Sequence, residues 1–152
     1  MGIVDRKTRS TMMAGIKGKD TRPELVLRRA LHAAGFRCRL RQKGLPGRPD
    51  MVFRRIQAVV FVHGCFWHRH EGCRFATNPA TRQDFWAAKF EANTQRDGVV
   101  MDQLLGLGWR VAVVWECALK NPEGVKQVCA DLSDWLLGDG ITFETGSFDL
   151  LA

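Results

Sequence analysis

The sequence predicts an α/β protein in which a mixed β-sheet is flanked by helices. Residues 58–62 are a continuous apolar run and residues 109–115 are apolar except for Arg110, and both segments have the composition of buried central strands. A long segment of helical character separates these runs, and further helical segments precede and follow them. Strands that alternate with helices in this way form a sheet covered on both faces. The chain has 152 residues, of which 45% are hydrophobic, which is enough to build one domain with its own core.

The first half of the chain contains a capped helix followed by short strands. Thr21 stands before the helix, Glu24 follows at the spacing of a capping box, and Gly35 ends the apolar repeat. Residues 36–40 alternate between apolar and polar, as a short strand would. The remaining expected elements are a loop rich in Gly and Pro at 44–49, a strand at 50–53, a turn at 54–55 and the central strand at 58–62.

The second half begins with an irregular segment, residues 64–79, which groups His, Cys and aromatic residues. Thr81 is expected to cap a long helix that reaches about residue 105, where Gly106 and Gly108 interrupt it. The expected elements after it are the strand at 109–115, an amphipathic helix at 122–137 and a short, mildly apolar tail at 141–152.

The chain is basic, with 23 Lys and Arg residues against 16 Asp and Glu residues and a net charge of +7. Such a surplus favours a polyanionic partner, although a basic surface also serves solubility. Residues 1–19 are expected to be a basic arm that contacts the polyanion, and residues 20–152 a single domain. The chain shows neither a membrane-spanning apolar run nor a signal-peptide core, so a cytoplasmic protein without a membrane partner is expected.

Cysteine and histidine residues have the spacing of a metal site. The ligand set is Cys65-x4-His70-x2-Cys73 with Cys117 far downstream. Three thiolates and one imidazole match a closed, structural zinc site, which would order the irregular loop and tie it to the end of the 109–115 strand. The alternative is that these are free, buried cysteines. Cys38 and Cys129 have no such neighbours and are expected in the core.

An acidic residue opens one expected strand and a histidine closes the next. Asp50 follows Pro49, and residues 61–63 end the central strand. Two adjacent strands can bring these positions together, an arrangement that resembles the PD-(D/E)xK nuclease core, in which an acidic pair and a lysine converge on Mg²⁺ and the scissile phosphate. Here Phe61 stands where the second carboxylate would be, and His63 stands where the lysine would be.

These residues could still support magnesium chemistry. The carboxylate of Asp50 and the backbone carbonyl of Val62 are hard oxygen ligands suited to Mg²⁺. Glu24 could hold a water on the metal, and His63 or His68 could deprotonate the attacking water or stabilise the developing charge. The alternatives are that Asp50 is a turn residue after proline and that Glu24 is only the capping-box partner.

Several aromatic residues stand where a core position is hard to justify. Phe66 and Trp67 lie in the irregular, polar loop, and Trp86 begins the long helix. Such side chains can wedge between base steps and kink a duplex, at lower cost where base pairing is already weak. The alternative is that they pack against the zinc site.

Several longer motifs make the sequence resemble the very-short-patch-repair (Vsr) mismatch endonucleases. They are Leu45-Pro46-Gly47-Arg48-Pro49-Asp50, Phe61-Val62-His63-Gly64-Cys65-Phe66-Trp67-His68, Ala80-Thr81-Arg82 with Phe85-Trp86, and Gly108-Trp109-Arg110-Val111 with Val114-Trp115-Glu116-Cys117. Thr8-Arg9-Ser10 with Met13 and Ile16 is similar to that family's N-terminal helix. The resemblance covers about residues 5–137, nearly the whole chain.

The resemblance implies a restriction-endonuclease-like fold and double-stranded DNA with a T:G mismatch, the product of 5-methylcytosine deamination, as substrate. The implied reaction is a magnesium-dependent nick of one strand on the 5′ side of the mismatched thymine. Such enzymes usually act as monomers and cooperate with mismatch-repair proteins such as MutL.

Carried over position by position, the resemblance assigns a role to each candidate residue. Asp50 is the principal Mg²⁺ ligand with the Val62 carbonyl, and Glu24, His63 and His68 act around the metal and the phosphate, with His68 as general base. The implied structural zinc ligands are Cys65, His70, Cys73 and Cys117. The implied intercalating residues are Phe66, Trp67 and Trp86 from the major-groove side and Met13 and Ile16 from a minor-groove arm.

The sequence departs from some members of that family at two places. Val62 stands where some relatives have threonine, so a carbonyl ligand is retained but a hydroxyl contact is lost. The stretch from His68 to Cys73 differs in length and contains fewer histidines, which makes His68 the second candidate for the zinc ligand assigned to His70.

Three rival interpretations follow from the same residues. A non-catalytic zinc module for DNA binding needs the Cys and Trp groups but not Asp50, Glu24 and His68 together. A nuclease with the same core could act on other DNA, as a restriction enzyme or a junction resolvase. A zinc hydrolase is disfavoured because three thiolates suit structural rather than catalytic zinc.

Overall fold

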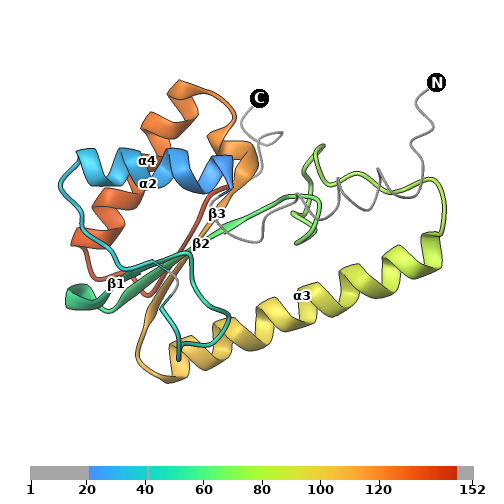
Figure 1. Ribbon diagram of the computed structural model, residues 1–152, viewed down its shortest axis with the longest axis horizontal. Helices are drawn as coiled ribbons and strands as arrows, with labels where there is room; N and C mark the ends of the chain where they lie inside the picture. The colour runs from blue at the N-terminus through green and yellow to red at the C-terminus, as the bar shows by residue number, and fades with distance from the viewer. Residues whose placement is uncertain (1–20, 41, 147–152) are drawn as a thin grey trace.

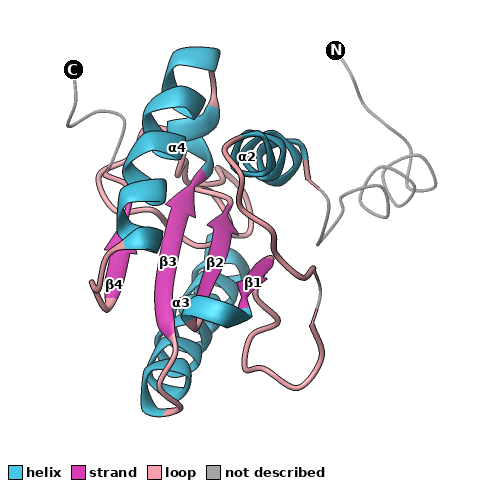
Figure 2. Ribbon diagram, turned by 90° about the vertical axis from the view of Figure 1, so that its left-hand side faces the viewer, coloured by secondary structure: helices cyan, strands magenta, loops and turns pink. Residues whose placement is uncertain are grey.

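The apolar runs of the sequence form the centre of one four-stranded sheet. The computed structural model describes residues 21–40 and 42–146. The strands lie side by side in the order β1-β2-β3-β4, with β1 antiparallel to β2 and the other two pairs parallel (Figures 1 and 2). Their bounds are Met51–Phe53 for β1, Ala58–His63 for β2, Arg110–Trp115 for β3 and Thr142–Glu144 for β4.

Three α-helices of the described chain cover the two faces of the sheet. Helices α2 (Arg22–Ala33) and α4 (Pro122–Leu137) lie together on one face, and the long helix α3 (Gln83–Gly106) runs along the other (Figures 1 and 2). Two short 3-10 helices, Arg54–Ile56 and Glu116–Leu119, follow β1 and β3. The predicted mixed α/β architecture is therefore confirmed.

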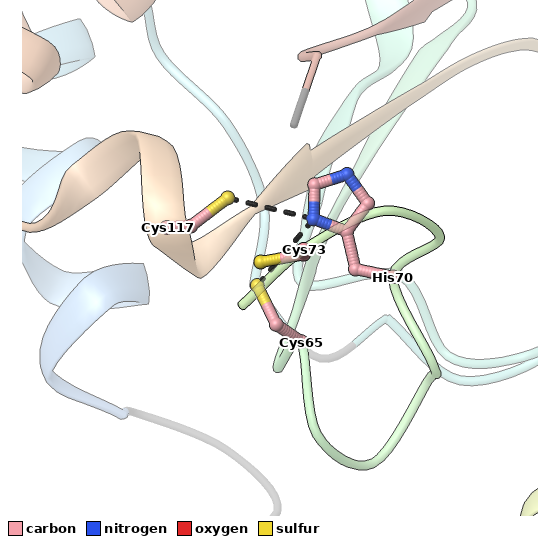
Figure 3. A group of neighbouring side chains, drawn as sticks. All are labelled: Cys65, His70, Cys73 and Cys117. Atoms are coloured by element: carbon pink, nitrogen blue, oxygen red, sulfur yellow. Dashed lines mark hydrogen bonds between the residues drawn. The ribbon is translucent and has the colours of Figure 1, made fainter. Parts of the chain in front are cut away.

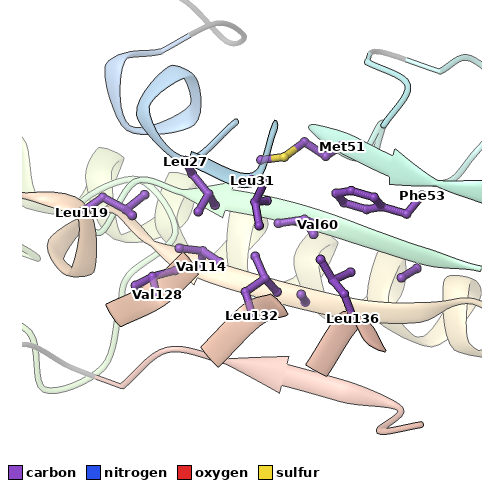
Figure 4. Packing of buried hydrophobic residues seen from close by; sticks show 12 residues of the cluster. Leu27, Leu31, Met51, Phe53, Val60, Val114, Leu119, Val128, Leu132 and Leu136 are labelled. Atoms are coloured by element: carbon purple, nitrogen blue, oxygen red, sulfur yellow. The ribbon is translucent and has the colours of Figure 1, made fainter. Parts of the chain in front are cut away.

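The larger core lies between the sheet and the helix pair α2 and α4. Apolar side chains at helical spacing on both helices meet the alternate residues of the strands that point to that face (Figure 4). The fully buried members include Leu27, Leu31, Met51, Val60, Val114 and Leu132. Cys38 and Cys129 pack against this core, as predicted.

A smaller core lies under the C-terminal half of α3. Leu104 is fully buried there against Val52, Val59 and Val111 of the sheet. The N-terminal half of the helix extends beyond the sheet (Figure 1), and Phe90 is its only buried residue. This half of α3 instead borders the irregular segment 64–79, so the helix carries side chains from the core to the site described below.

Helix boundaries agree with the sequence at most ends. Helix α2 begins after Thr21, whose side chain makes no capping bond, while its backbone N–H donates to Glu24, so one half of the capping box is formed. Gly35 follows the helix with a φ of 102°, a conformation that glycine adopts without strain. Helix α4 has the predicted bounds and is capped by the Asn121 side chain, which accepts from the Gly124 N–H.

Two expectations about elements are wrong. Residues 36–40 form no strand, because only Arg39 pairs with Val52 as an isolated bridge. Thr81 does not cap α3, since the chain enters that helix through Arg82 with a left-handed φ of 53°. The tail, for which the sequence predicted no element, contains strand β4, which pairs with β3 at the edge of the sheet and is mostly exposed, so it lacks the apolar run of a central strand. No described helix is long and apolar enough to cross a membrane.

Candidate active site and metal centre

The predicted zinc ligands come together at the end of β3. Cys65 and His70 lie in the loop after β2, Cys73 follows three residues after His70, and Cys117 lies in the 3-10 helix after β3. One potential ligand atom from each of the four lies within 4.8 Å of the others, and all four residues are buried (Figure 3). The His70 Nδ1 atom points into the group, 3.6 Å from the Cys65 Sγ and 3.5 Å from the Cys117 Sγ.

The chemistry of this group fits a metal ion. Burial, together with the neighbouring thiols of Cys117 and Cys73, raises the pKa of the Cys65 thiol far above its usual value. Burial lowers the pKa of His70, and this shift also favours an uncharged side chain, here the neutral imidazole that coordinates metals. Since several thiolates cannot stay charged beside one another without a cation, a bound metal supplies the compensating charge. The cluster could therefore hold a metal, in the donor set of a structural zinc site.

Trp115 fixes the orientation of the histidine in this cluster. Its indole ring stacks on His70 at a centroid distance of 4.2 Å and an interplanar angle of 7°. The Trp115 Nε1 donates to the Glu144 carboxylate of β4 at 2.8 Å, and the Trp115 backbone N–H donates to the Thr145 hydroxyl. The edge strand β4 and the residue after it thus hold the Trp115 ring that stacks on His70 of the Cys and His cluster.

Asp50 lies where β1 begins and meets the end of β2. The Val62 backbone N–H donates to the Asp50 Oδ2 at 2.7 Å, so the predicted neighbourhood of these two residues is present. The pKa of Asp50 is raised from 3.8 to about 7, mainly because the carboxyl group is buried and to a smaller extent because of the nearby charge of Glu24, while the Val62 hydrogen bond and His68 act in the opposite direction. The carboxyl group is therefore held in surroundings that disfavour its charge unless a cation is present.

Glu24 reaches the same region from α2. Its side chain is 3% exposed, and burial raises its pKa, while Arg28 and the Thr21 N–H lower it. One oxygen lies 3.8 Å from the Arg28 guanidinium. Glu24 is therefore the partial capping-box partner and also acts electrostatically on Asp50, while its role in holding a water on the metal stays a prediction.

His63 and His68 form a stacked pair beside Asp50. Their rings lie 3.9 Å apart between centroids with an interplanar angle of 6°. The His68 Nδ1 lies 2.6 Å from the Oδ2 of Asp97, an aspartate on α3. Burial and, to a smaller extent, the neighbouring His68 lower the pKa of His63 from 6.5 to about 4 against the opposing effect of Asp97, so His63 is neutral at physiological pH.

Asp97 is the residue of this site that the sequence analysis missed. It follows Asn93 by one helical turn, and the Asn93 amide donates to the Trp67 carbonyl at 3.2 Å. Both residues stand on the stripe of α3 that begins at buried Phe90 and ends at buried Leu104. A polar residue such as Asp97 on the apolar stripe of a helix often has a specific partner, and this position in the helical repeat was the sequence signal that could have identified Asp97.

An open cleft joins these residues. It has a volume of about 800 Å³ and is lined by Asp50, His63, His68 and Asp97 together with the cations Arg48 and Arg96. Its floor is the sheet end at Phe61 and Val113, and α3 forms one wall. The cleft therefore presents carboxylates, imidazoles and guanidinium groups to the same space.

The predicted aromatic wedge forms a cluster next to the cleft. Phe66 contacts Trp67, Trp86 and Phe90 at centroid distances of 5.0, 5.7 and 5.1 Å. Trp67 and Trp86 lie 5.8 Å apart, and Phe66, Trp67 and Trp86 are each only partly buried. These rings pack on one another and on α3 rather than on the metal cluster, which leaves part of their surface open.

Arg69 holds the loop that carries this aromatic cluster. Its guanidinium lies 4.1 Å from the Phe90 ring centroid. It also donates to the carbonyl oxygens of Phe66, Ala76 and Thr77 and to the Asn78 side chain. Since the loop has little regular structure of its own, these bonds and the buried Cys and His cluster hold it in place.

Two of the predicted site residues cannot be located. Met13 and Ile16, with the whole basic arm at 1–19, lie outside the described residues. The other predicted residues fall into three neighbouring groups, which are the buried Cys and His cluster, the acid and histidine cleft, and the aromatic cluster. The Val62 backbone contact seen here is made through its N–H, and the role of its carbonyl stays a prediction.

Comparison with known proteins places this arrangement in a family. Residues 1–74 match the family described as DNA mismatch endonuclease Vsr. The chain is 40% identical to the DNA mismatch endonuclease Vsr of Escherichia coli strain K12, over 99% of this chain and 98% of that protein. It is 50% identical to the type II nicking enzyme V.XorIIP of Xanthomonas oryzae pv. oryzae, over 74% of this chain and 82% of the relative.

A third relative agrees with these two. It is the type II nicking enzyme V.NmeAIP of Neisseria meningitidis, with 41% identity over 85% of this chain and 89% of that protein. The matches cover most of both partners, including the cleft, the Cys and His cluster and the aromatic cluster. The chain therefore belongs to the Vsr family of DNA mismatch endonucleases.

Proposed function

We propose that this protein nicks one strand of a DNA duplex on the 5′ side of the mismatched thymine in a T:G pair, by magnesium-dependent hydrolysis. The observation that carries the proposal is the meeting of Asp50 with the His63, His68 and Asp97 group in one open cleft beside an aromatic cluster. The names of the relatives, a mismatch endonuclease and nicking enzymes, support the reaction class.

The donor set around Asp50 suits a hard divalent cation. Burial, with the nearby Glu24 charge, raises the pKa of Asp50, so the ionised carboxylate that a cation requires is stabilised only in part by the Val62 N–H and His68 and would gain from a bound cation. The N–H and C=O groups of one strand residue point to the same side, so the Val62 carbonyl faces the same side as the N–H that bonds Asp50. Bound there, Mg²⁺ would polarise the scissile phosphate and neutralise developing charge.

His68 is the general base in this proposal. Asp97 accepts a hydrogen bond from the His68 Nδ1–H, which leaves the lone pair of Nε2 free to take a proton from the attacking water. The carboxylate also stabilises the imidazolium that results, as an orienting acid does in other hydrolases. Asp97 is thus a positioning residue, and His63 packs on the other face of His68 and restricts its ring.

The Cys65, His70, Cys73 and Cys117 group is proposed to hold zinc in a structural role. All four ligand positions of a tetrahedral site are filled by protein, so none is left for a substrate. Such a site holds the loop that carries both His68 and the aromatic cluster. Metal binding therefore supports catalysis through position rather than through chemistry.

The aromatic cluster is proposed to recognise the mismatch. Phe66, Trp67 and Trp86 present partly exposed rings beside the cleft, and their insertion into DNA requires unstacking of base pairs. Unstacking costs less where pairing is already weakened, which gives a preference for a mismatch. The basic arm at 1–19, with Met13 and Ile16, is proposed to contact the minor-groove side.

The fold itself is proposed to be restriction-endonuclease-like, with a modified PD-(D/E)xK core. Two features support this proposal: Asp50 directly precedes β1, and His63 ends the antiparallel neighbour β2, so both residues lie at the same end of this strand pair. Residues 20–152 are proposed as one nuclease domain that acts as a monomer. Mismatch-repair proteins such as MutL are proposed partners on the family resemblance alone.

A strand-specific cleavage assay tests the proposal. Duplexes labelled on either strand, with a T:G pair or a matched T:A pair at the same place, are incubated with the protein and Mg²⁺. We expect a single nick 5′ to the mismatched thymine, no product without the cation, and loss of nicking in Asp50→Ala with DNA binding retained. Nicking by Asp50→Ala at the wild-type rate would refute the site, and equal cutting of the matched duplex would refute the specificity.

A further inference from the structure

The strongest unassigned feature is Arg48, one of three arginines that line the cleft with Arg69 and Arg96. The guanidinium of Arg69 is engaged by the carbonyl and amide oxygens of its own loop. Arg48 is exposed, and in the part of the chain that the structure describes its side chain makes neither a hydrogen bond nor an ion pair. A cation therefore stands two residues before Asp50, in the same cleft, and contributes no side-chain contact to the described fold.

The backbone of Arg48 has a conformation that arginine adopts only at a cost. Its φ is 47°, in the left-handed region, where the Cβ of an L-residue is crowded and glycine is not. Its backbone N–H donates to the Leu45 carbonyl, a bond that any residue except proline could make. The turn would thus be satisfied by glycine. A strained residue whose side chain does not support the fold is a candidate for a functional role.

The residues on both sides fix the base of the Arg48 side chain. Gly47 approaches α3 so closely that an added Cβ would overlap Val100. Pro49 is fully buried, and its ring restricts φ. Asp50 is held by the hydrogen bond from the Val62 N–H. The backbone of Arg48 is therefore set in place relative to the Asp50 carboxylate, as a preorganised electrostatic group requires.

We propose that Arg48 is a catalytic residue whose guanidinium binds the non-bridging oxygens of the phosphate being cleaved, an assignment that rests on the proposed function. A guanidinium presents a planar pair of N–H donors that matches two phosphate oxygens. As the oxygen of the attacking water bonds to phosphorus and the bond to the leaving oxygen breaks, negative charge is concentrated around the phosphorus. Arg48 stabilises this charge in addition to the cation proposed at Asp50.

The first test pairs Arg48→Gly with the matched control Gln57→Gly. Gln57 is exposed, has a φ of 49° and is not among the residues that line the cleft, so both substitutions relieve the same backbone strain. Both should change the urea midpoint little and in the same direction. With saturating protein, we expect the single-turnover nicking rate to fall about a hundredfold in Arg48→Gly and to stay unchanged in Gln57→Gly. Nicking by Arg48→Gly at the wild-type rate would overturn the proposal.

Chemical rescue separates a role in charge stabilisation from a role in shaping the loop. Guanidinium chloride, well below denaturing concentrations, should restore part of the rate of Arg48→Gly, whereas sodium chloride at the same concentration should not. Arg48→Lys should nick at an intermediate rate, because lysine retains the charge as a single point but lacks the planar pair of donors. A slow Arg48→Gly that guanidinium does not rescue, together with an equally slow Arg48→Lys, would overturn the assignment.

A binding experiment keeps this proposal distinct from the proposed function. Without Mg²⁺, affinities are measured for duplexes in which one phosphate at a time is replaced by a neutral methylphosphonate. We expect one position at which the wild-type chain loses affinity and Arg48→Gly loses no more, since the same contact cannot be removed twice. Additive losses at every position would overturn the phosphate contact. If the wild-type chain nicks no duplex, the proposed function fails, and the methylphosphonate series still decides whether Arg48 binds a phosphate.

Discussion

Asp50 illustrates how one residue can reduce stability in favour of chemistry. Its carboxyl group is placed among buried atoms and near Glu24, and its pKa is about 7 instead of 3.8. The unfolded chain releases this proton near pH 4, whereas the folded chain keeps it until near pH 7. The folded state therefore binds more protons between these values, and its stability falls as the pH rises through this window.

The first prediction concerns Asp50→Asn in the absence of divalent cations. The asparagine side chain can still accept a hydrogen bond from the Val62 N–H, but it does not ionise. At pH 8 we therefore expect the substitution to raise the free energy of unfolding by about 2 kcal/mol, from ~1.4 kcal/mol per unit of pKa shift reduced by partial solvent screening. Below about pH 4 the two proteins should be equally stable. Urea denaturation across this pH range measures the difference.

The control for this prediction is Asp102→Asn, which removes an exposed charge and should change stability little at any pH. Addition of Mg²⁺ should stabilise the wild-type protein and not Asp50→Asn, because only a ligand that binds the native state shifts unfolding. A lower stability of Asp50→Asn at pH 8 would contradict the electrostatic account of this residue.

At the scale of elements, the irregular loop 64–79 depends on the metal cluster and on Arg69 for its shape. Residues 64–79 contribute neither a helix nor a strand, yet they carry His68 and Phe66. The buried residues of this loop are Cys65, His70 and Cys73, all of which belong to the Cys and His cluster. Loss of one ligand should therefore disturb the site more than the sheet.

The second prediction compares Cys73→Ser with Cys129→Ser. Serine is a poor zinc ligand, so Cys73→Ser is expected to fall well below one zinc per chain and to lose hydrogen-exchange protection in residues 64–79. Cys129 is a half-buried cysteine of α4 that packs against the main core, so its serine variant should keep the full zinc content. Elemental analysis measures the metal, and unchanged zinc in Cys73→Ser would contradict the ligand set.

The third prediction concerns the aromatic cluster. Trp67→Ala removes a partly exposed ring beside the cleft, so we expect nicking at a T:G mismatch to fall at least tenfold while binding to matched DNA changes little. Phe85→Ala is the matched control, because Phe85 contacts only Trp86 among the described rings and is 47% exposed. A larger loss of mismatch nicking in the control would argue against insertion of Trp67.

The elements that sequence analysis predicted well are those whose pattern is set by burial. Strands β2 and β3 are apolar except for His63 at the end of β2 and Arg110 at the start of β3, because helices cover both of their faces. Strand β4 has the exposed residues Thr142 and Glu144 at an edge, so its sequence resembles a loop. The residues 36–40 alternate in polarity, but a single bridge to β1 leaves them without the ladder that defines a strand.

The candidate site was predictable where its ligands are close in sequence. Cys65, His70 and Cys73 share one loop, and their spacing restricts their chemistry. Asp97 reaches His68 from 29 positions away on a helix, and its contact depends on how α3 crosses the sheet. The stacking of His63 on His68 and the Glu144 anchor of Trp115 likewise depend on tertiary packing, which no local pattern contains.

At the scale of the whole molecule, the charge of the chain is unevenly placed along the sequence. The first 19 residues carry Arg6, Lys7, Arg9, Lys17 and Lys19 against the single acid Asp5. The net charge of the whole chain is +7, so this arm contributes a net of four charges, or five minus one, to that surplus. Each basic side chain that neutralises a phosphate adds to the salt dependence of DNA binding.

The last prediction removes residues 1–19 and compares binding with the full chain over a series of salt concentrations. The sheet and its helices are formed by residues after the arm, so the truncated chain should unfold at nearly the same urea concentration as the full chain. Because the arm is proposed to contact phosphates, the truncated chain should bind duplex DNA on the order of tenfold more weakly or worse at 0.1 M salt. The slope of log K against log salt should become shallower by about 1–3, at roughly 0.9 per lost contact. If the slope is unchanged and mismatch nicking is weaker, the arm acts through Met13 and Ile16 rather than through its charge. If the truncated chain no longer unfolds cooperatively, residues 1–19 belong to the folded domain itself.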